Sequence, residues 1–209
     1  MIYLFSSIPL GEGFIETATS LAQRHDGKLV VIFSAKGSDH SWLRKMYREF
    51  RLYLRLGGRV RFVKDVNAPA FRKRIRPGDH GIIAGFGQIF REETIQAFET
   101  FVNLHASVLP LYRGPVPSYW CIKNGEKRTG FTIHRVTKEI DRGEILYQQA
   151  VEIGDIDDPK ILTRKILQSA SDVFAKYLVY LLEGGEWERK EVDAFELYET
   201  HVDYLSFPE

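Results

Sequence analysis

Short apolar runs alternate with longer segments of helical period along the chain, and this alternation limits the fold more than any other feature. Ile2–Phe5, Leu29–Phe33 and Gly81–Ala84 have the length and composition of buried strands. The segments between such runs repeat their apolar residues at helical spacing. Strands that alternate with helices predict βαβ units, and therefore an α/β fold with a largely parallel sheet.

The same alternation continues to the C-terminal part of the chain. We expect further strands at Val60–Val63, Phe101–His105, Phe131–Val136 and Glu144–Val151. We expect helices at Phe14–Arg24, Trp42–Leu56, Pro69–Arg74, around Trp120, and at Pro159–Leu182. Apolar spacing in the first helix predicts that its core side is formed by Phe14, Ala18, Leu21 and Ala22. A long domain over residues 1–185 and a short extension over 186–209 account for the whole sequence.

Composition excludes several classes of protein. The 209 residues carry a formal net charge of +1, which gives no general attraction to nucleic acid. Basic residues gather in Arg44–Arg61, as on a solvated helix face. A single cysteine, Cys121, excludes an internal disulfide and a multi-cysteine zinc site. We expect a cytoplasmic protein without a membrane partner, since no secretory leader and no apolar run of about 20 residues is found.

Polar residues follow three of the expected strands. In open α/β sheets, ligands bind beyond the carboxyl ends of parallel strands. Three loops leave such strand ends. One begins at Gly85, one runs through Asn103–Pro110, and one ends at Asp141. The polar side chains able to do chemistry lie on these three loops.

Two of those polar residues share one face of a strand. Asn103 and His105 are two positions apart, so their side chains point the same way. An amide can donate a hydrogen bond to a developing oxyanion, and an imidazole can exchange a proton near neutral pH. A carboxylate such as Asp141 would favour the protonated imidazole and fix its orientation. Taken alone, an Asn-x-His pair at a strand end is more often structural than catalytic.

Covalent catalysis lacks an obvious nucleophile in this sequence. The pattern Gly-x-Ser-x-Gly does not occur, and Cys121 has no adjacent histidine. We therefore expect transfer of an acyl-type carbon to a nucleophile that the substrate supplies.

Several spaced motifs point to one family. They are Asn103–Pro117, Asn124–Glu126, Thr129–His134, Asp141–Gln148 and, upstream, Ala84–Ile89. In this order they resemble the signature of the folate-dependent formyltransferases, with good agreement over residues 81–150. The resemblance implies the Rossmann-like fold of that family and a co-substrate, 10-formyltetrahydrofolate, whose formyl group passes to a primary amine. It implies no metal.

The resemblance also implies a role for each matching residue. Asn103 would bind the formyl oxygen and its developing negative charge, and His105 would assist proton transfer from the attacking amine. Asp141 would hold His105 and a water molecule. His134 would support the site together with Ser107 and Thr132. The pteridine ring would be held by backbone at Phe86, Gly87, Gln88, Ile89 and Phe90, and at Glu139, Ile140 and Asp141.

The acceptor amine is less well specified by the motifs. The segment Ser6–Gly11 is a poor match to the phosphate loop of the enzymes that formylate glycinamide ribonucleotide. Methionyl-tRNA formyltransferases continue into a further β-barrel domain, whereas this sequence ends at Glu209. The turn Tyr112–Gly114 and Trp120 resemble the sugar and tRNA enzymes, so we expect an amino sugar nucleotide as the small-molecule acceptor.

Other functions remain open at this point. The glycinamide ribonucleotide and methionyl-tRNA acceptors are alternatives, and a hydrolase of the same family would give the formyl group to water. A metal-dependent hydrolase could use His105, His134 and Asp141 as ligands, and a binding domain without catalysis could keep the same fold. The apolar end Tyr204–Pro208 could dock on the chain itself or pair with a second subunit of a homodimer.

Overall fold

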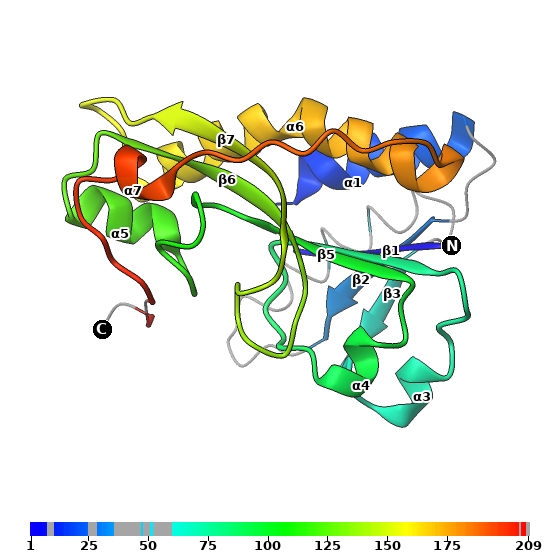
Figure 1. Ribbon diagram of the computed structural model, residues 1–209. Helices are drawn as coiled ribbons and strands as arrows, with labels where there is room; N and C mark the ends of the chain where they lie inside the picture. The colour runs from blue at the N-terminus through cyan, green and yellow to red at the C-terminus, as the bar shows by residue number, and fades with distance from the viewer. Residues whose placement is uncertain are drawn as a thin grey trace. The chain divides into compact units, whose positions relative to one another are not determined.

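The computed structural model describes residues 1–7, 11–24, 29–35, 47, 51, 60–204, 206 and 207 (Figure 1). The expected helix Trp42–Leu56 lies outside these residues apart from Tyr47 and Arg51, and so does most of the loop between Ser6 and Gly11. The chain divides into two compact units. The first comprises Met1–Phe101 and Ala175–Gly185, and the second Val102–Phe174 and Glu186–Glu209.

The first unit contains a parallel sheet whose strands are those expected from the apolar runs. They are β1 (Ile2–Ser6), β2 (Leu29–Ser34), β3 (Val60–Val63) and β4 (His80–Ala84), in the order β3-β2-β1-β4. β1 pairs in parallel with β2 on one side and with β4 on the other. All five residues of β1 are buried, as a central parallel strand requires.

Aromatic side chains fill the core of the first unit. Phe5 is fully buried, and its ring lies 4.9 Å from that of Phe90 and 5.6 Å from that of Phe101. Tyr3, Phe71, Phe86 and Phe98 complete the cluster around it. The ring of Phe101 occupies the space that a side chain at position 81 would need, which accounts for Gly81.

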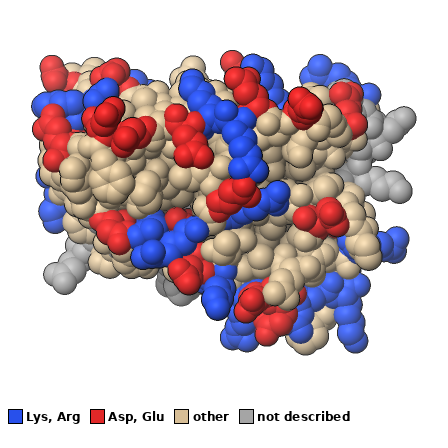
Figure 2. Space-filling view, viewed as in Figure 1, with Lys and Arg blue, Asp and Glu red and all other residues tan. Residues whose placement is uncertain are grey.

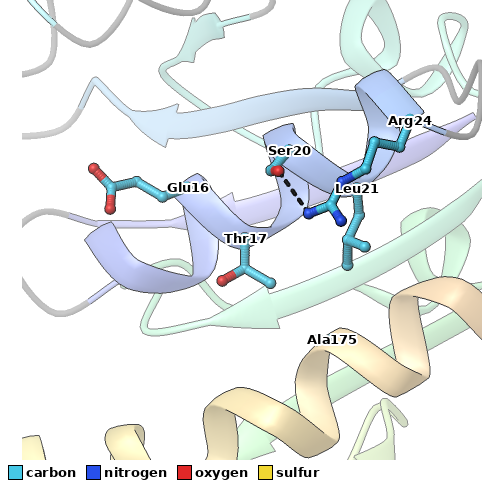
Figure 3. A pocket seen from close by; sticks show the side chains of 6 residues that line it. All are labelled: Glu16, Thr17, Ser20, Leu21, Arg24 and Ala175. Carbon is cyan, nitrogen blue, oxygen red and sulfur yellow. Dashed lines mark hydrogen bonds between the residues drawn. The ribbon is translucent and has the colours of Figure 1, made fainter.

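In the described part of the first unit, α1 covers Glu12–Arg24, α3 covers Pro69–Arg72 and α4 covers Glu92–Ile95. Phe14, Ala18 and Ala22 of α1 are buried as expected, but Leu21 is only half-buried, so that prediction is wrong. Ile15 and Thr19 are buried in its place. Leu21 instead lines a shallow cavity of about 340 Å³ between α1 and Ala175, where Arg24 donates to the Ser20 hydroxyl (Figure 3). No candidate site residue lines this cavity.

The second unit contains β5 (Thr100–His105, from Val102 onward), β6 (Arg128–Arg135) and β7 (Ile145–Glu152). β5 pairs with β6 and β6 with β7, both antiparallel (Figure 1). The sheet is therefore parallel only in the first unit. No helix lies between β6 and β7, so no crossover connects them as parallel pairing would require. The α/β, Rossmann-like class is confirmed with this antiparallel addition.

Helices α5 (Pro117–Lys123) and α7 (Ala194–Leu197) also belong to the second unit, whereas α6 (Pro159–Glu183) begins in it and ends in the first. Two glycines allow close backbone approach near β6. A side chain at Gly130 would clash with the carbonyl of Gln149 on β7, and one at Gly143 would clash with the carbonyl of Arg135. Both clashes are with backbone, so these positions accept only glycine without a shift of the strands.

The segment after α6 packs along the second unit itself. The amides of Tyr112 and Arg113 donate to the carbonyls of Val202 and Asp203 at 2.8 and 2.9 Å. The indole N–H of Trp120 donates to the carbonyl of Ser206. Val202, Asp203 and Ser206 of the C-terminal segment thus accept hydrogen bonds from their own chain.

Candidate active site

Strand β5 presents Asn103 and His105 from one face, as their spacing predicts. β6 runs antiparallel beside it, with Asn103 opposite His134 and His105 opposite Thr132. Directly opposed residues of two strands have neighbouring side chains on the same face of the sheet. The pairing therefore brings His134 beside Asn103, which the sequence alone did not specify.

Asp141 lies at the centre of the polar cluster. One carboxylate oxygen, Oδ2, accepts the Gly114 N–H at 2.9 Å and lies 3.5 Å from His105 Nδ1. The other, Oδ1, lies 3.4 Å from His134 Nε2 and accepts a hydrogen bond from Asn103 Nδ2 at 3.3 Å. Asn103 Nδ2 also lies 3.2 Å from His134 Nε2. The three predicted catalytic residues and His134 thus meet around one carboxylate.

The electrostatics of this cluster favour a carboxylate beside a buried imidazole. Burial lowers the pKa of His105 below 6.5, more strongly than Asp141 and the Tyr112 carbonyl raise it. Burial also opposes ionisation of Asp141, but His105, His134 and the Gly114 N–H together hold the pKa of Asp141 well below its usual range. The carboxylate form of Asp141 is therefore favoured, and the imidazolium form of His105 is disfavoured by burial.

The backbone around the cluster is strained at three residues. Tyr112, Val116 and Asp141 have φ values of 57°, 49° and 53°, in the left-handed region that side chains rarely adopt. The positive φ values persist only where the surroundings fix them. The Leu109–Pro110 peptide bond is cis.

The supporting residues predicted from the motifs form a second polar layer. The Ser107 hydroxyl donates to the carbonyl of Leu111 at 3.1 Å, and the Thr132 hydroxyl donates to the carbonyl of Ser107 at 2.7 Å. Gln148 bridges this layer by donating to Thr132 Oγ1 at 3.0 Å and to the Leu109 carbonyl at 2.8 Å. Ser107 and Thr132 are fully buried, and their hydroxyls donate to carbonyls of the loop after β5.

The loop Gly85–Phe90 of the first unit divides into core and exposed positions. Phe86 and Phe90 belong to the aromatic cluster around Phe5. The Gln88 side chain accepts from the Val66 amide and donates to the Ser34 hydroxyl, which ties the loop to its neighbours. Gly87 and Ile89 are exposed, Ile89 at 69%. An open backbone at Gly87 and an apolar side chain at Ile89 fit one face of an aromatic ring.

The segment before Asp141 is the second loop assigned to folate binding. Glu139 is exposed, and Ile140 keeps 39% of its surface accessible. This loop thus offers an apolar side chain and free backbone of its own. The second unit also contains a cavity of about 400 Å³, whose lining includes Pro110, Arg113, Asp141 and Arg142. One of the predicted catalytic residues, Asp141, therefore lines a cavity.

Several buried polar residues around the cluster escaped sequence reasoning. Tyr112, Glu126, Gln148 and Tyr198 are nearly inaccessible. The Tyr112 hydroxyl donates to Glu126 at 2.6 Å, and the Tyr198 hydroxyl accepts the Val108 N–H at 2.8 Å. Tyr112, Glu126 and Gln148 lie inside the family motifs, and this position was the one sequence signal for them. The residue type gives no signal, because a polar side chain is ordinarily expected at the surface. For Tyr198 the sequence offers no signal.

Lysine and arginine side chains are interspersed with aspartate and glutamate on the face shown in Figure 2. Within the described ranges, no helix is long and apolar enough to cross a membrane. The same ranges contain no group of three histidine, cysteine, aspartate or glutamate side chains arranged to hold a metal ion.

An Asn–His–Asp cluster at the end of β5 in a Rossmann-like chain defines a candidate group-transfer site, and comparison with known proteins narrows the class. Residues 70–178 match the formyl transferase family. The chain therefore belongs to the formyl transferase family, as the motifs predicted.

Individual relatives show how far the likeness extends. A methionyl-tRNA formyltransferase of Caldanaerobacter subterraneus is 34% identical over 133 residues, which are 60% of this chain and 43% of that protein. The chain thus matches less than half the length of this curated relative.

Two solved structures share the fold. A sugar N-formyltransferase of a Shewanella species has a TM-score of 0.73 at 21% identity, and the match covers 98% of this chain and 75% of the Shewanella chain. Glycinamide ribonucleotide transformylase 1 of Symbiobacterium toebii has a TM-score of 0.68 at 24% identity, and the match covers 92% of this chain and 93% of the Symbiobacterium chain. Relatives with different acceptors share the fold, so the fold does not identify the amine.

Proposed function

We propose that the protein transfers the formyl group of 10-formyltetrahydrofolate to a primary amine. The observation that carries this proposal is the gathering of Asn103, His105 and His134 around Asp141, in a chain of the formyl transferase family. When bound, the folate supplies an activated one-carbon unit. The protein must then orient that unit, stabilise negative charge on its oxygen and remove a proton from the amine.

The side chains of the cluster can divide these tasks. Asn103 Nδ2 has two hydrogens, and its two acceptors in the cluster are His134 Nε2 and Asp141 Oδ1. By exchanging one of these acceptors for a substrate oxygen, the amide becomes an oxyanion donor. His105 and Asp141 together form an acid–base pair in which the carboxylate stabilises the imidazolium.

The positions that match the folate-binding motifs of the family include Gly87 and Ile89, and also Glu139, Ile140 and Asp141. The support is this match and the exposure of Gly87, Ile89, Glu139 and Ile140. Titration with 5-formyltetrahydrofolate, a stable analogue, should show saturable binding. An absence of binding at about millimolar ligand would contradict the proposal, because that limit corresponds to only about 4 kcal/mol of binding free energy.

For the acceptor we propose an amino sugar nucleotide. The balance of charges gives little general attraction to RNA, and Ser6–Gly11 is a poor match to the phosphate loop of the purine enzymes. Tyr119 and Trp120 are half-exposed, with ring centroids 5.2 Å apart, and Lys123 Nζ lies 4.7 Å from the Trp120 ring. Two aromatic faces and an ammonium group suit a base and a phosphate.

The acceptor can be identified by competition. The protein and 10-formyltetrahydrofolate would be incubated with 3-amino- and 4-amino-deoxysugar nucleotides, glycinamide ribonucleotide and methionyl-tRNA, and each product would be followed by mass spectrometry. We expect a deoxysugar nucleotide to gain the formyl group fastest. Faster formylation of glycinamide ribonucleotide or methionyl-tRNA would replace this acceptor, and release of formate without any formylated amine would indicate the hydrolase.

A further inference from the structure

The backbone carbonyl of Tyr112 lies 2.9 Å from His105 Nε2. A carbonyl oxygen only accepts hydrogen bonds, so Nε2 must carry a hydrogen. In the neutral ring the lone pair is then on Nδ1, the nitrogen that lies 3.5 Å from Asp141 Oδ2. The position of one carbonyl therefore decides which nitrogen of His105 is free to take up a proton.

The backbone of Tyr112 does not by itself favour this position of the carbonyl, because its φ of 57° is unfavourable for a residue with a side chain. Three further contacts fix the residue. Its N–H donates to the Val202 carbonyl at 2.8 Å, its carbonyl also accepts the Ser107 hydroxyl at 3.2 Å, and its own hydroxyl donates to Glu126 at 2.6 Å. Tyr112 is completely buried, so no water replaces these partners from outside.

Glu126 accepts hydrogen bonds both from Tyr112 and from the C-terminal segment, and so connects the two. Its carboxylate, 3% exposed, accepts the Tyr112 hydroxyl, the amides of Glu199 and Thr200 at 2.7 and 2.9 Å, and the Thr200 hydroxyl. Burial of Tyr112 and its hydrogen bond to Glu126 raise the pKa of the phenol, which therefore remains a donor. A buried carboxylate is costly without such donors, so the arrangement depends on all of them.

We propose that Glu126 is a positioning residue for His105. Acting through Tyr112, it fixes the ring in the tautomer with hydrogen on Nε2, so that Nδ1 exchanges the proton beside Asp141. The shorter contact, 2.9 Å to the Tyr112 carbonyl against 3.5 Å to Asp141, supports this tautomer, whereas its value for catalysis rests on the proposed function. The titratable groups that face His105 are Asp141 and His134.

The alternative is that Glu126 only stabilises the fold. In that case its loss would lower the free energy of unfolding and leave the hydrogens of His105 where they are. The tautomer of His105 separates the two roles, because stability measurements respond to both. Nitrogen-15 chemical shifts of labelled histidines report which ring nitrogen carries hydrogen.

The experiment compares the wild-type full chain with Tyr112→Phe and Glu126→Gln. Tyr3→Phe is a matched control, because Tyr3 is another buried tyrosine, whose hydroxyl donates to the Arg74 carbonyl. We expect Nε2–H in the wild type and in Tyr3→Phe, and a mixture of tautomers in the other two variants. The turnover number for formylation should fall by up to about 10²-fold in those two, with little change in folate affinity, as expected when a reacting group is misplaced.

Each outcome decides the proposal. A neutral His105 ring in the wild type with its hydrogen on Nδ1 and none on Nε2 would overturn it at once, and so would a wild-type tautomer and rate in both folded variants. If Glu126→Gln does not fold, Tyr112→Phe gives the decision alone, since it removes one hydroxyl. If the wild type formylates no amine, the proposed function fails, while the nitrogen shifts still show whether Glu126 positions His105.

Discussion

The two units of the chain are stabilised by different kinds of buried group. The core of the first is aromatic and aliphatic, with Phe5 in ring contact with six other aromatic residues. In the second, buried polar groups such as Tyr112, Glu126, Thr132 and Gln148 bond to one another and to backbone. Apolar packing tolerates small shifts, whereas a polar network has a unique arrangement in which every donor meets an acceptor.

This difference suits the location of the chemistry. The predicted catalytic residues all belong to the second unit, where their partners are fixed by hydrogen bonds and by three residues of positive φ. Preorganised groups of this kind are what an oxyanion donor and an acid–base pair require. The comparison therefore predicts that changes in the polar network of the second unit affect the rate as well as stability, and that changes in the aromatic core of the first affect stability.

The largest effect should come from the acid–base pair. His105→Ala should lower the turnover number by about 10²–10⁴-fold. Asn103→Ala should cost about 10²–10³-fold. Because the residues act as a unit, the double variant His105→Ala with Asp141→Asn should be little worse than the poorer single variant. Folate affinity, measured separately, should change only modestly, since backbone would hold the pteridine.

Near-normal turnover by a folded, folate-binding His105→Ala variant would show that these residues do not carry the reaction. Tyr3→Phe serves again as the control, since it removes a buried hydroxyl whose hydrogen bond to Arg74 lies within the first unit.

In the first unit we expect a loss of stability without a loss of chemistry. Phe5→Ala removes a fully buried ring and should lower the free energy of unfolding by about 3–5 kcal/mol. Phe207→Ala, at a position 73% exposed, should change it by less than about 0.5 kcal/mol. Urea titration measures both. If Phe5→Ala left stability unchanged but abolished turnover, the division between the units would be wrong.

A smaller change should follow loss of one member of the polar layer. Gln148→Ala leaves the Leu109 carbonyl and the Val192 amide without their partner and should cost about 1–3 kcal/mol. The adjacent Gln149 donates only to the Ser169 hydroxyl and is half-buried, so Gln149→Ala should cost about 1 kcal/mol. Equal costs for the two neighbours would contradict the special role of the buried layer.

The sequence predicted the strands of the parallel sheet well, because their apolar runs need burial on both faces. It placed Asn103 and His105 on one face because strand geometry alternates. It did not predict the antiparallel pairing of β6 and β7 or that His134 would face Asn103, since register depends on contacts distant in sequence. Nor could it show that Glu126 is buried, because a glutamate after an Asn-Gly turn is ordinarily at the surface. The opposite error occurs at Leu21, an apolar residue that the helical spacing placed in the core but that is half-exposed.

Acid should weaken the second unit through His105. The pKa of His105 in the folded chain lies below 6.5, so the unfolded chain binds more protons as the pH falls. The stability that His105 contributes is therefore present above pH 6.5 and is lost on acidification. Asp141 adds a similar loss of stability below pH 3.8, which is the ordinary pKa of an aspartate carboxyl group. Urea unfolding from about pH 8 to about pH 5 should show a steeper decline for the wild type than for His105→Gln. Parallel curves would show that His105 keeps an ordinary pKa.

The smallest expected effect is that of metal removal. His105 and His134 each place one ring nitrogen 2.9 Å from a backbone carbonyl and turn the other toward Asp141. Histidines that bind metals are often held in this way, so the metal-dependent hydrolase deserves a direct test. Asn103 argues against it, because its amide nitrogen lies 3.2 Å from His134 Nε2 and 3.3 Å from Asp141 Oδ1, where its hydrogens would repel a cation.

We therefore expect dialysis against EDTA or 1,10-phenanthroline to leave formyl transfer unchanged. Asn103→Asp would remove the amide donor and add a second carboxylate, which favours a cation. This variant should lose transferase activity and should gain affinity for Zn²⁺, measured by calorimetry beside the wild type. Activity of the wild type that disappears with chelator and returns with zinc or iron would make Asp141 a metal ligand and would replace the acid–base pair.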